Sequence, residues 1–505
     1  MKIFVSVFCL VMLLTTAGHT QNNPFVSDSL TAYIEKGMKD WQIPGLAIAI
    51  VKDGKIVVMK GFGERNIQTH EKVDENTLFM IASNSKLFTG TALSQLAYNK
   101  KLTLNDRITK YFPDFRLYDK NTTEQVTIRD MLSHHLGTKT FQGDFTFWDG
   151  NLSRSQIIDR MRLLKPTGLF RQDFGYCNSC FLTAGEIIPK VSGKPWEVYV
   201  YDSIVLPLGM KNTHMLTSGM PQRPNVSKPY STSFTGDLHE LPYDQVDNLG
   251  PAGSMVSNVK DMARWLQLQL DSGRYEGKRI LPWPVIRATR DMATVISSRK
   301  SGSLPTHYTG YGLGVFMTDY NGKQVFWHTG GAFGFVTNTC FVPEENLGIT
   351  ILTNNDNQNF FEALRYQILD SYLGVPYVNR SLQQLPGHIK ETKEAVKNLA
   401  AMQARVKGTA PEQAIAAYTG SYVNDVYGNI NITSMGDELL IKFNSHNNLT
   451  AYMRYMDNGE WMLVYSNPAF GVFPVKFRIE NNKVISVDIK ASDFVEFDSY
   501  VFTKK

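Results

Sequence analysis

Cysteine is scarce in this chain, with four among 505 residues. Cys9 lies in an apolar N-terminal stretch, and the three that follow are too few for a disulfide scaffold. Cys177 and Cys180 have the spacing of a redox motif, but no thioredoxin-like or dinucleotide-binding pattern surrounds them. We interpret them as small buried helix residues.

A strong charge bias is also missing. Lysine and arginine total 52 against 47 acidic residues, a net charge of +5. Spread over this length, the charge is too weak to imply a nucleic-acid or membrane-surface partner, and we expect no nucleic-acid partner. The chain is 43% hydrophobic, which excludes disorder as its main state and permits one large and one small domain.

The chain has no apolar run of the about 20 residues needed to span a bilayer, so we expect no stable membrane span. Residues 3–14 are apolar except for Ser6, Lys2 precedes them, and small polar residues follow at 15–20. This pattern predicts a signal peptide over residues 1–20 and a periplasmic or secreted mature protein. A membrane anchor is the alternative, which the shortness of the run disfavours.

Several catalytic motifs are absent. There is no phosphate-binding P-loop, no His-Glu-x-x-His zinc helix and no Gly-x-Ser-x-Gly nucleophile elbow. His134 and His135 are adjacent and would diverge by about 100° on a helix, which makes them poor partners for one metal. We therefore expect neither a metal nor an organic cofactor.

The pattern of the first domain predicts an α/β (α+β) architecture. Strand-like runs lie at 45–51 and 56–59, joined by the turn Asp53-Gly54, and again at 311–316, 324–327, 336–342 and 348–352. Helical spacing is found at 27–41, 87–98, 128–135, 181–191 and 259–270. This order predicts an antiparallel sheet built from both ends of the domain around a helical insertion.

The pattern of the sequence changes after Tyr377. Residues 385–412 read as an exposed linking helix, and strand-like runs follow at 428–433, 438–443, 451–456, 460–465, 475–479 and 484–489. These runs predict a small antiparallel barrel or curved sheet. The expected division is a signal peptide (1–20), a larger mixed α/β domain (22–378), a linker with a helix (379–412) and a β domain (413–505).

Ser83 and Lys86 form a Ser-x-x-Lys motif at the start of a helical pattern. Residues three apart lie on one helix face, and a helix N-terminus favours developing negative charge. Desolvation lowers the pKa of a lysine, which can then take the serine proton. Because Ser257/Lys260 shares the spacing, as does one further pair at 297 and 300, the motif alone is weak.

Two more elements follow in order, Tyr176-x-Asn178 and His328-Thr329-Gly330. A phenol can shuttle a proton, an amide can bind a carbonyl group, and a glycine lets the backbone approach a ligand. The Tyr-x-Asn pattern is common by itself, and an ordinary glycine-rich hairpin turn would also explain the His-Thr-Gly segment.

The order of the three motifs resembles the serine β-lactamase and penicillin-binding-protein superfamily, most closely its class C-like branch. That branch includes D-Ala-D-Ala carboxypeptidases, D-aminopeptidases and esterases. The resemblance covers about residues 24–375 and implies a β-lactamase/transpeptidase-like fold. The C-terminal part resembles a lipocalin-like module often appended to such hydrolases.

The resemblance implies a role for each motif residue. Ser83 would be the acylated nucleophile, Lys86 its base and Tyr176 the group that protonates the leaving group. Asn178 would hold the substrate amide. The backbone N–H groups of Ser83 and Gly331 would form the oxyanion hole.

The third motif would face the carboxylate side of the substrate through His328, Thr329 and Gly330. His328 stands where β-lactamases and carboxypeptidases typically have lysine, and a histidine is charged only in part at neutral pH. This departure weakens the expectation of β-lactamase activity and favours ester or peptide hydrolysis. Either a charged imidazole meets the carboxylate, or His328 only makes hydrogen bonds within the site.

The sequence thus predicts an exported serine hydrolase acting through an acyl-enzyme on Ser83. Its small-molecule or peptide substrates would be D-amino-acid peptides, β-lactams or small esters. The alternative is a non-hydrolytic penicillin-binding receptor or scaffold whose β domain holds a partner.

Overall fold

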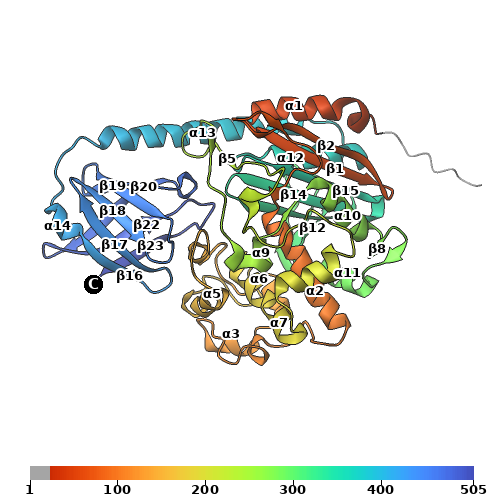
Figure 1. The fold of residues 1–505 in the computed structure, drawn as a ribbon, viewed down its shortest axis with the longest axis horizontal. Helices are drawn as coiled ribbons and strands as arrows, with labels where there is room; N and C mark the ends of the chain where they lie inside the picture. Colours follow the sequence, from red (N-terminus) through yellow and green to blue (C-terminus); the bar gives the residue numbers. More distant parts are fainter. Residues whose placement is uncertain (1–22) are drawn as a thin grey trace, which may run out of the picture.

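The computed structural model describes residues 23–505 and contains a nine-stranded antiparallel sheet, with the strand order β10-β11-β12-β13-β14-β15-β1-β2-β3 (Figure 1). The N-terminal β1 pairs with the late strand β15, so the sheet is assembled from both ends of the domain, as predicted. The predicted signal peptide lies outside the described residues. The strands are β1 (Gly45–Lys52), β2 (Lys55–Asn66), β3 (Glu71–Lys72), β10 (Thr294–Ser297), β11 (Thr309–Tyr311), β12 (Phe316–Tyr320), β13 (Lys323–Ala332), β14 (Phe335–Val342) and β15 (Leu347–Thr353).

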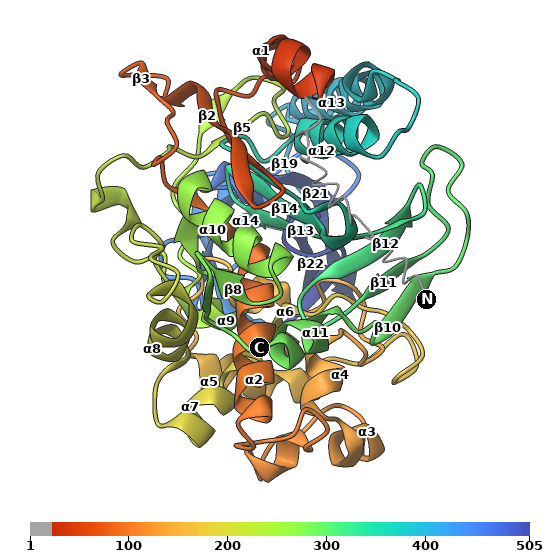
Figure 2. The same cartoon turned by 90° about the vertical axis from the view of Figure 1, so that its right-hand side faces the viewer.

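Helices cover both faces of this sheet (Figures 1 and 2). Because side chains alternate along a strand, Leu46 and Ile48 of β1 join one apolar cluster and Ala47 and Ala49 join the other. The first cluster includes α1 (Leu30–Asp40) and α12 (Phe360–Tyr372). The second includes α2 (Ser85–Tyr98), α10 (Val259–Leu270) and α11 (Trp283–Arg290).

The helical insertion lies between β2 and β10, and it carries most of the site. Its remaining helices are α3 (Lys120–Gln125), α4 (Ile128–Leu132), α5 (Arg154–Arg160), α6 (Asn178–Gly185), α7 (Ile187–Ser192), α8 (Trp196–Val200) and α9 (Gly250–Gly253). Its short strands pair as β4 (Phe79–Met80) with β7 (Val256–Ser257), β5 (Tyr230–Ser231) with β6 (His239–Glu240), and β8 (Arg274–Tyr275) with β9 (Lys278–Arg279).

A long helix, α13 (Arg380–Arg405), leads from the sheet domain to a closed eight-stranded barrel (Figure 1). The barrel closes where β16 pairs with β23. No helix among residues 23–505 is long and apolar enough to cross a membrane. The barrel follows α14 (Ile415–Tyr418) and comprises β16 (Gly420–Asn424), β17 (Gly428–Met435), β18 (Glu438–Phe443), β19 (Thr450–Tyr455), β20 (Glu460–Tyr465), β21 (Val472–Glu480), β22 (Lys483–Lys490) and β23 (Ser499–Lys504).

Three local predictions were wrong. The run 311–316 is not one strand, because the chain turns between β11 and β12 with Gly314 at a φ of 97°. The helix predicted over 128–135 ends at Leu132, and His134 adopts a left-handed φ of 57°. The helix predicted over 181–191 is divided into α6 and α7.

Candidate active site

Ser83 lies in a short 3-10 turn, Ala82–Asn84, that leads directly into α2. Lys86, in the first turn of α2, is completely buried, and its Nζ lies 2.9 Å from Ser83 Oγ. The same Nζ donates to Asn178 Oδ1 and to the carbonyl oxygen of Ala252, both at 2.7 Å. Burial lowers the pKa of Lys86 to about 7, so a large fraction is neutral near physiological pH.

The backbone around Ser83 is held tightly. Ala82 has a φ of 45°, a conformation that costs about 1–3 kcal/mol for a residue with a side chain. A Cβ on Gly330 would lie 2.0 Å from the carbonyl oxygen of Ile81, so only glycine lets β13 approach this closely. The third motif lies within β13, and Gly331 shares one pocket with Ser83.

Tyr176 lies over the lysine, with Lys86 Nζ 4.8 Å from the ring centroid. Burial raises the pKa of the phenol although its interaction with Ser83 opposes the rise, so the phenol is protonated. The ring of His134 stacks on Tyr176 at 4.2 Å, and its Nδ1 accepts from the N–H of Cys177 at 2.9 Å. Burial also holds the pKa of His134 well below its usual range, so the imidazole that stacks on the Tyr176 ring is neutral.

Asn178, the first residue of α6, connects the lysine to a carboxyl group that sequence reasoning missed. Its Nδ2 donates to Asp144 Oδ2 at 2.6 Å while its Oδ1 accepts from Lys86. Burial raises the pKa of Asp144 well above its ordinary value, which favours the neutral acid. Asp144 begins a short 3-10 turn, Asp144–Thr146, and belongs to no sequence motif, so only its contact with Asn178 identifies it.

The imidazole of His328 is neutral, unlike in the first alternative, where a charged imidazole meets the substrate carboxylate. It is 3% exposed, and burial with the nearby Lys86 lowers the pKa of its imidazole to about 3. Its Nε2 lies 2.9 Å from the hydroxyl of Tyr311, and its Nδ1 lies 2.7 Å from the carbonyl oxygen of Thr329. A neutral imidazole with both nitrogens engaged matches the second alternative, in which His328 makes hydrogen bonds within the site.

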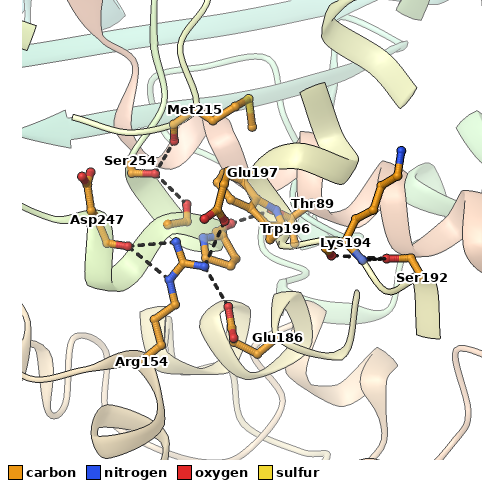
Figure 3. A network of polar contacts seen from close by, with 12 residues as sticks. Thr89, Arg154, Glu186, Ser192, Lys194, Trp196, Glu197, Met215, Asp247 and Ser254 are labelled. Carbon is orange, nitrogen blue, oxygen red and sulfur yellow. Dashed lines mark hydrogen bonds and ion pairs between the residues drawn. The ribbon is translucent and has the colours of Figure 1, made fainter. Parts of the chain in front are cut away.

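Figure 3 shows a network of polar contacts around Arg154 and Trp196. This network holds α9, the helix that contains Ala252, whose carbonyl oxygen accepts from Lys86. Arg154 of α5 donates to the carbonyl oxygen of Asp247 and to the carboxylate of Glu186, which ties α5 to the end of α6 and to the approach to α9. Trp196 donates to Thr89 Oγ1, which donates in turn to the carbonyl oxygen of Pro251. The carbonyl of the next residue is the one that accepts from Lys86.

These groups open into a cavity of about 480 Å³. Its lining includes Ser83, His328 and Thr329, and also Asp356, whose pKa burial raises to about 6. No lysine or arginine among the residues that the structure describes is part of this lining. The aromatic lining residues are Phe141, Trp148, Phe174, Tyr176, Phe316, Trp327, Phe361 and Phe494.

Phe494 belongs to the C-terminal barrel domain, which sequence reasoning left outside the site. Its ring lies near Gly331, where an added Cβ would be 3.1 Å from it, and it packs against Trp148 at 5.8 Å. No local motif marks this residue, because only the docking of the two domains brings it to the pocket.

Ser257 and Lys260, one of the two competing Ser-x-x-Lys pairs, do not form such a site. Lys260 Nζ bonds to Asn76, while the hydroxyl of Ser257 bonds to Thr213. Cys177 and Cys180 are both buried and unpaired. Cys180 is a buried helix residue as interpreted from the sequence, whereas Cys177 has an extended backbone and precedes α6. Within residues 23–505 no group of three or more His, Cys, Asp or Glu side chains is arranged to hold a metal ion.

The chain belongs to the β-lactamase family, which it matches over residues 30–373. This is the serine β-lactamase and penicillin-binding-protein superfamily expected from the three motifs, and its members are generally serine hydrolases. Residues 404–504 match a second family, described as a domain of unknown function (DUF3471).

Particular relatives are distant. Protein flp of Staphylococcus aureus (strain COL) is 25% identical over 345 residues, which are 67% of this chain and 65% of that protein. This chain therefore spans slightly less than two thirds of that relative. Unguisins hydrolase ungD' of Aspergillus campestris is 28% identical over 428 residues, 79% of this chain and 76% of the relative.

Two solved structures share the fold. The octameric penicillin-binding protein homologue from Pyrococcus abyssi aligns with a TM-score of 0.60 and 21% identity, covering 94% of this chain and 99% of its own. A D-stereospecific amidohydrolase from Streptomyces sp. aligns with a TM-score of 0.55 and 22% identity, covering 66% of this chain and 95% of its own.

Proposed function

We propose that this protein is an exported serine hydrolase that cleaves amide or ester bonds through an acyl-enzyme on Ser83. The observation that carries the proposal is the contact of Ser83 Oγ with a buried Lys86 whose pKa is lowered to about 7. An alcohol is a weak nucleophile unless a base removes its proton. A lysine that is half neutral near pH 7 suits this task.

The proposed reaction has two halves. Neutral Lys86 accepts the proton of Ser83 as Oγ attacks the substrate carbonyl, and the N–H groups of Ser83 and Gly331 stabilise the oxyanion. The protonated phenol of Tyr176 donates its proton to the leaving group, and the proton held by Lys86 restores the phenol. Water then attacks the ester carbonyl of the acyl-enzyme and gives a proton to the Tyr176 oxygen, while the phenol passes its own proton to neutral Lys86. Lys86 returns this proton to Ser83 Oγ, and Ser83 leaves as the free alcohol.

The pocket favours substrates whose recognised end is uncharged or cationic. A free carboxylate would meet aromatic rings, a neutral His328 and the carboxyl groups of Asp144 and Asp356. Oδ1 of Asp356 is buried and has no hydrogen-bond partner among the described residues, and with a pKa of about 6 this carboxyl group is mostly ionised at pH 7. Hydrogen-bond acceptors of this kind suit an amide N–H or an ammonium group. We therefore favour small esters and D-amino-acid peptides over β-lactams, which carry a carboxylate.

The test is active-site labelling with a fluorescent fluorophosphonate, followed by turnover assays. We expect Ser83→Ala to abolish labelling and Ser297→Ala, from the other Ser-x-x-Lys pair, to leave it unchanged. Hydrolysis of short-chain p-nitrophenyl esters or D-amino-acid peptides should exceed hydrolysis of nitrocefin. Labelling that survives Ser83→Ala would refute the nucleophile. Labelling without turnover of any substrate class would favour the receptor alternative.

Export rests on the sequence of residues 1–20 alone. We expect N-terminal sequencing of the mature protein to begin near residue 18 or 21, because cleavage sites follow small residues such as Ala17. Finding Met1 or Lys2 on the mature chain would refute export with cleavage.

A further inference from the structure

Side chains of the barrel domain pack against and hydrogen-bond to the segment that carries Asp144. Phe145, the next residue, is completely buried among barrel side chains. Its ring stacks on His446 at 4.4 Å and on Tyr500 at 5.2 Å, and its carbonyl oxygen accepts from His446 Nε2 at 2.7 Å. The loop residue beside the catalytic machinery is therefore anchored in the second domain.

A buried carboxyl group of the barrel domain, that of Glu496, also holds this segment. It is 1% exposed and accepts from the backbone N–H of Gly143 at 2.9 Å and of Phe145 at 3.4 Å. The hydroxyls of Tyr427 and Tyr500 donate to it at 2.7 and 3.3 Å. Four donors surround the group, an arrangement that suits an ionised acceptor, although burial raises the pKa of Glu496 to about 7.

The two backbone N–H groups held by Glu496 flank Asp144. Asp144 accepts from Asn178, and Asn178 accepts from Lys86. A continuous series of short contacts thus runs from the barrel to the lysine that contacts Ser83. Side chains in such a series are positioned by their neighbours, and a small displacement at a reacting group can cost a large factor in rate.

We propose that Glu496 is a positioning residue of the hydrolase site: it fixes the Gly143–Phe145 turn so that Asp144 holds Asn178 against Lys86. The inference rests on the proposed function, since its measured effect is on acylation of Ser83. It assigns the barrel domain a task in the reaction, because without Glu496 the turn loses two of its backbone hydrogen bonds.

The test is a double-mutant cycle on the rate of Ser83 labelling by fluorophosphonate in the full-length protein. Glu496→Gln replaces an acceptor oxygen by an N–H₂ group that faces other donors. We therefore expect the labelling rate to fall about tenfold, the effect of losing one hydrogen bond to a charged group. Asp144→Ala should also slow labelling. If Glu496 acts through Asp144, the double variant should be no slower than Asp144→Ala alone.

Asp498→Asn is the matched control. Asp498 pairs with Lys139 across the same domain contact, but both side chains are half-exposed rather than buried. This variant should label at the wild-type rate and show simple additivity with Asp144→Ala. If Glu496→Gln does not fold, Tyr427→Phe removes the shortest hydroxyl donor while keeping the ring, and it should slow labelling in the same coupled way.

A folded Glu496→Gln within twofold of wild type, or effects that multiply in the double variant, would overturn the proposal. Failure of the proposed function would look different, because wild-type protein would then not be labelled at Ser83 at all.

Discussion

Lys86 Nζ lies 2.9 Å from Ser83 Oγ and is enclosed on every side by protein. Burial lowers the pKa of Lys86 to about 7, and the opposing influences of Asp144 and Cys177 do not restore it. The buried phenol and imidazoles around it are neutral, so among these neighbours of Ser83 the lysine is the group expected to titrate near neutral pH. Asp356 and Glu496, whose pKa values burial raises to about 6 and about 7, make no direct contact with Ser83. The relationship between these two residues sets the expected pH dependence.

We expect the acylation rate to rise with pH and to level off above about pH 8, because only the neutral amine accepts a proton. The fluorophosphonate labelling rate between pH 5.5 and 9 measures this. Lys86→Arg retains the charge but cannot act as base, so it should lose roughly 10²-fold in rate together with the pH dependence. A flat wild-type profile would contradict the assignment of Lys86.

The neutral state of His328 predicts matching pH profiles for neutral and acidic substrates. Because its pKa is lowered to about 3, the imidazole gains no charge between pH 7.5 and 5.5 and offers nothing extra to a carboxylate. The measurement is kcat/KM for a neutral p-nitrophenyl ester and for nitrocefin over that range. Because Asp356 of the same pocket has a pKa of about 6, its loss of negative charge over this range would also favour a carboxylate, so the comparison is made in Asp356→Asn. A selective gain for nitrocefin that persists in this variant as the pH falls would show that His328 becomes charged and meets the carboxylate.

Phe494 predicts that the barrel domain influences substrate binding. Phe494→Ala should raise KM for p-nitrophenyl esters by roughly tenfold, since a ring that buries apolar substrate surface is lost, while kcat changes less. Tyr452→Ala is the control, because Tyr452 is an exposed ring of the same barrel. An unchanged KM in folded Phe494→Ala would place the substrate elsewhere in the cavity.

Gly330→Ala should be destabilising and inactive. Its Cβ would lie 2.0 Å from the carbonyl oxygen of Ile81, so β13 or the turn of Ser83 must move, at a cost of about 1–3 kcal/mol. Gly387→Ala is the matched control: Gly387 lies exposed in α13 with open space around its Cα, and alanine there should add about 0.5–1 kcal/mol. Urea denaturation measures both, and equal stability of the two variants would contradict the tight packing of β13 against Ile81.

The sequence by itself determined the sheet and the first contacts of the site. Alternating and helical periodicities depend on local residue order, so the sheet built from both ends and the boundaries of α10 could be predicted. The Ser-x-x-Lys spacing placed Ser83 and Lys86 within reach, because three residues make nearly one helical turn. Local glycine geometry already limited this accuracy, as the break between β11 and β12 shows.

Only the tertiary structure decided the closure of the barrel, the charge of His328 and the parts played by Asp144, Phe494 and Glu496. The strands that close the barrel, β16 and β23, start 79 residues apart, at Gly420 and Ser499, and neither carries a clear alternating run. A pKa depends on burial and neighbours, which a linear pattern does not specify. Residues separated by more than three hundred positions, such as Gly143 and Glu496, meet only because two domains dock, so no local motif could identify them.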